Sequence, residues 1–314
     1  MFLTNHDAEQ FEGLIDSRIL LSIYNLLIVG NNITSQSIGL DALLQFVKIG
    51  NNALTVLNKP DLISNLGDLF EYLQSDYVDL QLHSLCILEK LSFQFTTKKA
   101  QDDLELVPVN GELPLQAIQS SILPVSPIII ELFQVNICKI INLLQKEKGN
   151  KQHQVVLDIL FNLSHNEKIQ EKIVEHSGLN SILHSISSDN LQIQNSALSL
   201  IHNLSNSEIN QREICRSSII LSQLLNLTKD HQQEIIVQKS LQTVVQLANS
   251  NENKIKLMEA GAIEPILAMI LSDLPSLAET FVPDFILSSN IQVQTATCLA
   301  VLSLSKKRSG SPYY

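Results

Sequence analysis

The sequence predicts an all-α fold, a right-handed α solenoid built from about six stacked helical repeats. The first observation is a recurrent helix ending, whose leucines Leu163, Leu204, Leu247 and Leu304 follow one another at intervals of 41, 43 and 57 residues. Repeats of two or three helices have a period of about 40–47 residues. The second observation is the composition: apolar residues make up 45%, aromatic residues only 5%, and tryptophan is absent. Helices packed through Leu and Ile fit this profile better than a sheet does.

The clearest repeat runs from Asn166 to Ser205 and contains three expected helices, at 167–175, 179–186 and 191–204. Apolar residues recur at helical spacing in the third of them, at Ile193, Ala197, Leu200, Ile201 and Leu204, which gives this helix one apolar face. Gly178 lies between the first two expected helices, where glycine permits a sharp turn. The same plan returns after Asn251, with a short helix at 253–258.

A second turn carries a resemblance to a known family. The string Glu-Ala-Gly-Ala-Ile-Glu-Pro-Ile-Leu at 259–267 resembles the armadillo-repeat phrase in which a short helix ends in Glu-Ala-Gly and a proline-started helix follows. Gly178 matches the turn at Gly261, whereas Arg216-Ser217-Ser218 has no glycine. Over residues 130–306 the chain resembles armadillo-repeat (ARM/HEAT-like) proteins of the catenin / Vac8-like type. It lacks the tryptophans with which a classical importin-alpha holds lysine stems.

The repeats predict a single armadillo-like solenoid over residues 1–306, followed by a disordered tail at 307–314. Residues 1–50 are expected to form an atypical N-terminal cap, because one face of a terminal repeat meets water. Two intervals exceed the period, which predicts insertions at 95–134 and 273–289. The first contains Pro108, Pro114, Pro124 and Pro127, so much of it is expected to be loop.

Charge and motifs argue against several classes of function. A net charge of −11 disfavours a nucleic-acid backbone or an anionic membrane as the main ligand. Metal-binding, phosphate-binding and nucleophile motifs do not occur in the sequence, so we expect no enzyme, no cofactor, no metal and no small-molecule substrate. The four cysteines are scattered through apolar stretches, at Cys86, Cys138, Cys215 and Cys298. Reduced thiols and the lack of a signal peptide or membrane-spanning segment predict a cytoplasmic protein, with a nuclear location as the alternative.

The resemblance implies a binding groove lined by the third helices. In that family, an asparagine near the C-terminal end of each third helix hydrogen-bonds the main chain of an extended peptide, since a carboxamide both donates and accepts. Asn162 and Asn203 match this position, and Gln246 keeps the amide. The candidate residues one turn earlier are Asp158, Ser199 and Gln242. The alternative is that these amides cap helix ends and satisfy local carbonyls.

The predicted function is therefore that of a non-catalytic protein-binding adaptor or scaffold. It would hold an extended segment of a partner protein in the groove of the third helices. The alternative is a structural or regulatory subunit of a larger complex, such as a cytoskeletal, trafficking or ubiquitin-ligase assembly. Such a subunit would be bound through its outer helices or its acidic insertions.

Overall fold

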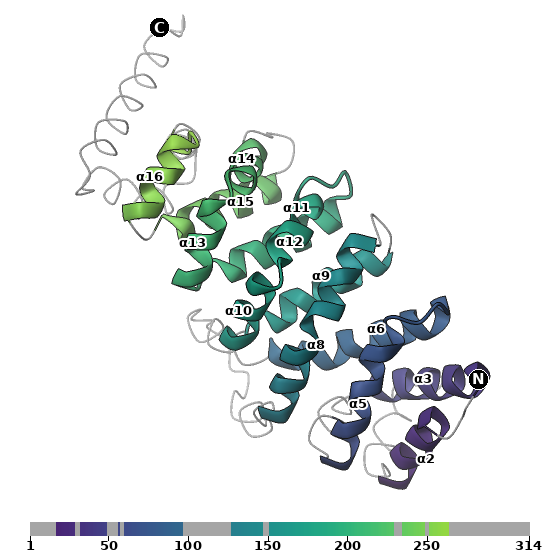
Figure 1. Cartoon of the computed structure of the whole chain (residues 1–314). Coiled ribbons are helices and arrows are strands. Elements are labelled where there is room, and N and C mark those ends of the chain that lie inside the picture. Colours follow the sequence, from purple (N-terminus) through teal and green to yellow (C-terminus); the bar gives the residue numbers. More distant parts are fainter. Residues whose placement is uncertain are drawn as a thin grey trace, which may run out of the picture. The chain divides into compact units, whose positions relative to one another are not determined.

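The computed structural model describes residues 17–28, 32–48, 56, 60–96, 127–146, 151–228, 234–248 and 251–263. All regular secondary structure in these ranges is helical (Figure 1). The chain divides into two compact units, residues 1–176 and 177–314. The predicted insertion at 273–289, the tail at 307–314 and the last leucine, Leu304, lie outside the described residues, as does most of the first insertion.

The first unit stacks its third helices in succession. Its described helices are α2 (Ser17–Ile28), α3 (Ile33–Val47), α5 (Pro60–Tyr72), α6 (Val78–Ser92), the short 3-10 helix η1 (Phe93–Phe95), α8 (Pro127–Lys146), α9 (Lys151–Leu163) and α10 (Glu167–Glu175). The third helices of this unit are α3, α6 and α9, and α3 packs on α6 and α6 on α9. Helix α5 packs on α6 and α8, and α8 packs on α9 and α10. Phe133 holds these layers together, because its ring lies edge-to-face on Phe70 at 5.4 Å and on Phe95 at 5.6 Å.

The second unit repeats the same plan. Its described helices are α11 (Gly178–Ile186), α12 (Leu191–Leu204), α13 (Glu208–Arg216), α14 (Ser218–Leu227), α15 (Glu234–Leu247) and α16 (Asn251–Glu259). The two third helices, α12 and α15, lie side by side (Figure 1). Helix α11 packs on α12 and α14 on α15, and α13 contacts α14 and α16.

The recurrent leucine is the core marker of each described repeat. Leu91, Leu163, Leu204 and Leu247 are all 0% exposed, and the last three end α9, α12 and α15. The helices expected at 167–175 and 191–204 have these bounds in the structure, and the helix expected at 179–186 begins one residue earlier. Burying a leucine completely stabilises the fold by about 1.5–3 kcal/mol. The leucines that mark the repeat in the sequence therefore also stabilise the fold.

Side chains at the helix starts explain where several helices begin. The amide oxygens of Asn32, Asn166 and Asn190 accept hydrogen bonds from the backbone N–H groups of Ser35, Ile169 and Gln192, at 2.8, 3.3 and 3.0 Å. Each bond satisfies an N–H that has no partner inside its helix. Pro60 and Pro127 are the first residues of α5 and α8, a position at which proline costs no helical hydrogen bond.

The predicted role of Gly178 is wrong by one residue. Ser177 adopts the left-handed conformation with φ 61°, and Gly178 is the first residue of α11. At the equivalent turn Gly261 has φ 85°, as the resemblance implied for a glycine there. The junction between α13 and α14, which has no glycine, has a different backbone conformation. Ser217 is extended there, with φ −86° and ψ 96°, and its hydroxyl accepts a hydrogen bond from the N–H of Ile220.

Helix α8 overlaps the first predicted insertion. It begins at Pro127, so residues 127–134 are helical, and 97–126 lie outside the described residues. The stretch Pro127–Gln145 is long and apolar enough to cross a membrane by length and composition, with a mean hydropathy of 1.6. Helix α8 packs against α5, α9 and α10 with Phe133, Ile137 and Ile140 buried, and 39% of its most apolar 18-residue window is buried.

Candidate functional site

The two matched asparagines are buried rather than presented to solvent. Asn162 is 8% exposed, and its Nδ2 donates to Ser92 Oγ at 3.0 Å, which joins α9 to the preceding third helix α6. Asn203 is 5% exposed, and its Oδ1 accepts from Asn206 Nδ2 at 3.1 Å. These contacts give both amides a partner inside the protein, although neither partner is the local carbonyl that the alternative expected. Asn162 goes beyond a local cap, since its bond connects two repeats.

The serine that follows the recurrent leucine has a structural role that sequence reasoning missed. Ser92, Ser164 and Ser205 are 0% exposed, and each hydroxyl donates to the carbonyl three residues before it, at 2.8, 2.6 and 2.6 Å. A buried hydroxyl needs such a partner, because a polar group without one costs free energy. Each of these helices therefore ends near a buried serine whose hydroxyl is hydrogen-bonded to the helix's own backbone.

Buried or partly buried glutamines join successive helices at two recurring places. Gln170 and Gln211 donate through Nε2 to the carbonyls of Ser164 and Ser205, at 2.5 and 2.9 Å. In the same way Gln81 and Gln194 donate to the carbonyls of Leu73 and Ile186, at 2.7 and 3.0 Å. Each pair stands at equivalent repeat positions: Gln170 and Gln211 are 41 residues apart, and Gln81 and Gln194 each stand ten residues before the recurrent leucine. This recurrence was the signal in the sequence. Each bond satisfies a carbonyl at or just beyond a helix end.

The other four candidate residues are all partly exposed. Asp158 on α9 accepts from Gln154 Nε2 at 2.9 Å through Oδ1. Ser199 on α12 donates to the carbonyl of Asn195 at 2.8 Å. Gln242 and Gln246 lie one turn apart on α15, and their side chains make no hydrogen bond within the described ranges. Among the six candidate residues, the accessible amides are therefore those of α15.

Lys239 joins the two third helices of the second unit, and sequence reasoning missed it. Its Nζ donates to Asn195 Oδ1 at 2.8 Å and to Ser199 Oγ at 2.6 Å, both on α12. Desolvation in this half-buried position lowers the pKa of Lys239. Beside it, Thr243 donates to the carbonyl of Lys239 at 2.8 Å and lies 3.4 Å from Nδ1 of His202.

We call the resulting surface the α12–α15 polar face. It consists of the partly exposed residues Asn195, Ser199 and His202 on α12 and Lys239, Gln242 and Gln246 on α15. On α15 the spacing of Lys239, Gln242 and Gln246 by three and then four residues places them on one side of the helix. The side of α15 that carries them is therefore polar along about two turns.

The described thiols are buried or half-buried. Burial raises the pKa of Cys215 to about 12, and desolvation also raises the pKa of Cys86. Cys86, Cys138 and Cys215 are free thiols, as the sequence predicted, while Cys298 lies outside the described residues. In the ranges that the structure describes, no group of three or more His, Cys, Asp or Glu side chains is placed to hold a metal ion.

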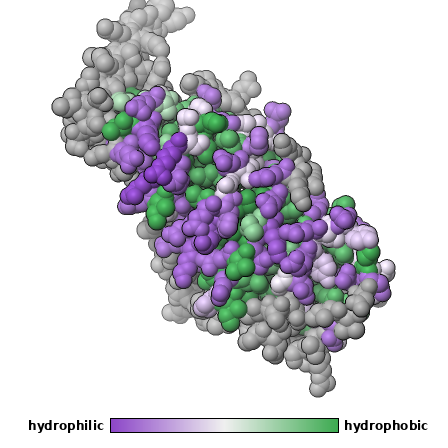
Figure 2. Space-filling model, viewed as in Figure 1, coloured by the Kyte–Doolittle hydropathy of each residue, from purple (hydrophilic) through white to green (hydrophobic). Residues whose placement is uncertain are grey.

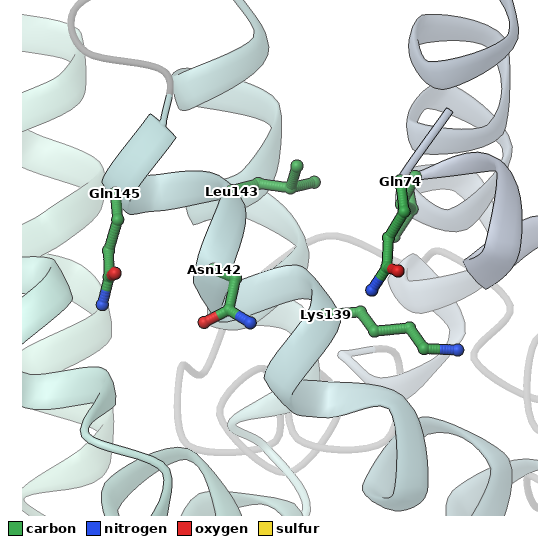
Figure 3. Close-up of a pocket in the computed structure, with 6 residues that line it drawn as sticks. Gln74, Lys139, Asn142, Leu143 and Gln145 are labelled. Carbon is green, nitrogen blue, oxygen red and sulfur yellow. The ribbon is translucent and has the colours of Figure 1, made fainter. Parts of the chain in front are cut away.

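A polar pocket lies in the first unit, between the end of α5 and helix α8. It has a volume of about 520 Å³ and is lined by Leu73, Gln74, Lys139, Asn142, Leu143 and Gln145. Figure 3 shows Lys139 extending from α8 toward the end of α5, where Gln74 lies. Lys139 Nζ also pairs with Glu71 Oε1 at 2.7 Å. This pocket belongs to the outer helices and is separate from the third-helix surface of its unit.

The described surface is mixed in hydropathy. Figure 2 shows a face on which hydrophilic side chains predominate and hydrophobic ones form small groups. Among the most exposed apolar side chains are Val135 at 70% and Ile235 at 68%, on α8 and α15. Single exposed apolar residues are ordinary on a protein surface and do not mark a site by themselves.

Comparison with known proteins identifies the fold. No family model matches the sequence, and no curated protein has a matching sequence. Among solved structures, the designed armadillo repeat protein YIII(Dq)4CqI is similar at TM-score 0.58 and 16% identity, over 91% of this chain and 99% of that chain. The designed armadillo repeat protein YIII(Dq.V1)4CPAF in complex with the peptide (KR)4 is similar at TM-score 0.58 and 16% identity, over 90% and 98%.

A third similar structure is that of computationally designed armadillo repeat proteins for modular peptide recognition, with TM-score 0.58 and 16% identity over 90% of this chain and 99% of that chain. At this level of identity the likeness concerns the fold. It confirms the predicted all-α superhelix and the armadillo-like character of the repeats. The chain therefore has the fold of an armadillo-repeat solenoid.

Proposed function

We propose that this chain is a non-catalytic adaptor or scaffold that holds an extended segment of a partner protein against its third helices. The observation that carries the proposal is the pair Gln242 and Gln246. Both side chains are partly exposed and lie one turn apart, and neither makes a hydrogen bond within the described residues. A carboxamide offers a donor and an acceptor, so it matches a peptide group whatever side chain that peptide carries.

The surroundings of this pair support the same function. Ser199 and Asn195 on α12 add a hydroxyl and an amide to the α12–α15 polar face, so polar groups extend over two adjacent repeats. Two structures with the same fold are a complex with the peptide (KR)4 and a design for modular peptide recognition. A preformed helical surface binds an extended chain without ordering a loop of its own, which keeps the entropic cost of binding low.

The six candidate residues have different roles in this proposal. Gln242 and Gln246 contact the partner in the second unit, and Ser199 fixes the ammonium group of Lys239 beside them. In the first unit, Asp158 offers a carboxylate on α9. Asn162 joins α9 to α6, and the buried Asn203 bonds Asn206 just beyond the end of α12. Direct contact of these two amides with a partner stays a prediction, and so does the cytoplasmic location.

Selection of binding peptides tests the proposal directly. A library of random peptides displayed on phage is selected against the full chain, and the selected peptides are synthesised. The double variant Q242A/Q246A is expected to bind them about tenfold or more weakly, because two hydrogen bonds to the peptide are lost. A matched control, Gln45→Ala/Gln223→Ala, removes two carboxamides from α3 and α14, outside the α12–α15 polar face, and should leave affinity unchanged. Equal affinity of the Q242A/Q246A variant and the wild type would reject the assignment.

The pocket between α5 and α8 favours the second candidate, a subunit held in a larger assembly through its outer helices. Gln74, Asn142 and Gln145 are exposed carboxamides around a cavity of about 520 Å³, which suits a polar segment of a neighbouring subunit. The predicted contribution of the acidic insertions concerns residues outside the described ranges. The double variant Asn142→Arg/Gln145→Arg would block this pocket and leave the α12–α15 polar face intact. Loss of peptide binding in this variant, with binding retained in Q242A/Q246A, would favour the second candidate.

A further inference from the structure

Lys239 is a positive charge held between two repeats by neutral groups. Its ammonium group is fixed by Asn195 Oδ1 at 2.8 Å and by Ser199 Oγ at 2.6 Å. The Ser199 hydroxyl donates its own proton to the carbonyl of Asn195, so its oxygen is free to accept from the lysine. An ammonium group has three N–H donors. Two of them are used on α12, which leaves the third for a ligand.

No carboxylate of the described residues compensates this charge. The ion pairs in the described ranges involve other basic side chains, such as Lys139 with Glu71 and Lys256 with Glu252, and none includes Lys239. Lys239 is also half-buried, and the desolvation that lowers its pKa is an unfavourable term for the charged form. A bound anion would offset this term without any change in the fold, because the ammonium is already in place.

The neighbouring side chains select the kind of anion. Helix α12 has no acidic residue, and on α15 the only acidic residue is Glu234 at its first position. Gln242 and Gln246 follow Lys239 on the same side of α15 and offer amide donors and acceptors to a main chain. A peptide with an acidic side chain therefore fits this face, with its backbone at the glutamines and its carboxylate at the lysine. A basic peptide would place like charge beside Lys239.

We propose that Lys239 is the subsite for an aspartate or glutamate side chain of the bound partner segment. The inference rests on the proposed function, since it places one side chain of the peptide that the α12–α15 polar face holds. Asn195 and Ser199 are positioning residues in this arrangement, because they fix the ammonium and do not carry the charge. The contact is a charge-assisted hydrogen bond in a partly desolvated position, where such bonds are stronger than at an open surface.

The test is a peptide selection carried out in parallel on the wild type and on charge variants at this position. Random peptides are displayed at the free N-terminus of a phage coat protein, so that no peptide presents a C-terminal carboxylate. Wild-type chain is expected to enrich Asp or Glu at one peptide position, K239M to lose that enrichment, and K239E to select Lys or Arg there. The matched control is K256M on α16, which removes a lysine elsewhere in the same unit and should select as the wild type does.

A single pair of peptides then gives the size of the effect. Replacing the selected Glu by Gln should weaken binding to the wild type about tenfold and leave binding to K239M unchanged, as expected for one partly desolvated ion pair. If K239M does not fold, as judged by circular dichroism, K239Q replaces it, because glutamine keeps hydrogen bonding to α12 without the charge. A lysine with only a structural role would not reverse the charge preference in K239E.

The outcomes separate the two proposals. Binding peptides without acidic enrichment in the wild type, or equal enrichment in the wild type and K239M, would overturn the subsite and leave the proposed function standing. Selected peptides whose affinity is unaffected by Q242A/Q246A would overturn the proposed function, and the subsite with it. Enrichment of free carboxyl termini over internal acids in a second, C-terminal display library would also overturn the assignment to a side chain.

Discussion

Replacing Asn162 by alanine should destabilise the first unit, because this side chain joins two repeats. The substitution removes the Nδ2 donor that lies 3.0 Å from Ser92 Oγ at a site only 8% exposed. A net hydrogen bond contributes about 0.5–1.5 kcal/mol, and the small void left by the carboxamide adds to the loss. Ser92 keeps its own bond to the carbonyl of Glu89 at 2.8 Å, which limits the penalty on that side. We expect a loss of about 1–2 kcal/mol in the free energy of unfolding.

Urea unfolding followed by circular dichroism measures this loss, and a double-mutant cycle assigns it. Asn162→Ala, Ser92→Ala and the double variant should show a coupling energy of about 1 kcal/mol, as for residues in direct contact. The matched control is Gln246→Ala, at the equivalent repeat position on α15. Its side chain is partly exposed and makes no hydrogen bond within the described residues, so its effect should stay below about 0.5 kcal/mol.

The opposite pattern would refute this reasoning. If Asn162→Ala unfolds with the stability of the wild type and yet loses peptide binding, Asn162 contacts the partner as the resemblance implied. A coupling energy near zero would show that the bond to Ser92 contributes nothing to stability. Hydrogen exchange of α6 and α9 would locate the loss, since opening of these two helices should become more frequent in the variant.

Three further substitutions and one labelling experiment have defined outcomes. Ser177→Gly should stabilise the chain by about 0.5 kcal/mol in thermal melting, because relief of the left-handed conformation at φ 61° exceeds the added entropy of the unfolded chain; a loss of stability would contradict this. Leu204→Asp should cost about 3–5 kcal/mol or abolish folding, since the site is 0% exposed, and an unchanged melting curve would be inconsistent with the repeat register. Gln211→Ala should cost about 1–3 kcal/mol in urea unfolding by leaving the Ser205 carbonyl without its donor, and a neutral result would reject the fastening role. Burial raises the pKa of Cys215 to about 12, so at about pH 8 this thiol should react with iodoacetamide far more slowly in the folded chain than in the urea-unfolded chain. Its contribution to the free energy of unfolding should fall as pH rises from about 9 toward 12, because the folded chain keeps the proton that the unfolded chain loses. Equal labelling rates would contradict the burial.

The helices could be predicted from the sequence because their periodic features are redundant. The leucines at Leu163, Leu204 and Leu247 mark helix ends and core positions together, and apolar residues between them repeat at helical spacing. Errors arose where one residue decides the geometry. At the turn before α11, the left-handed residue is Ser177, and the adjacent Gly178 drew the prediction because glycine is the usual residue for that conformation.

The candidate site was predicted only in part, for a reason that lies in helix packing. Asn162 and Asn203 directly precede the core leucine and are buried, whereas Gln246 at the same position of α15 is partly exposed. Helical periodicity places a residue on a helix face, but the neighbouring repeat decides whether that face is covered. Lys239 escaped prediction for the same reason, since its partners Asn195 and Ser199 stand 44 and 40 residues earlier in the chain.

Photo-crosslinking of a selected peptide tests the central claim most directly. A benzophenone side chain in place of Val245 lies next to Gln246 on α15, and one in place of Asn142 lies in the pocket of α8. With the same labelled peptide, we expect crosslinks from position 245, competed by unlabelled peptide, and none from position 142. Crosslinks from position 142 alone would contradict a partner-binding surface on the third helices and place the partner on the outer helices.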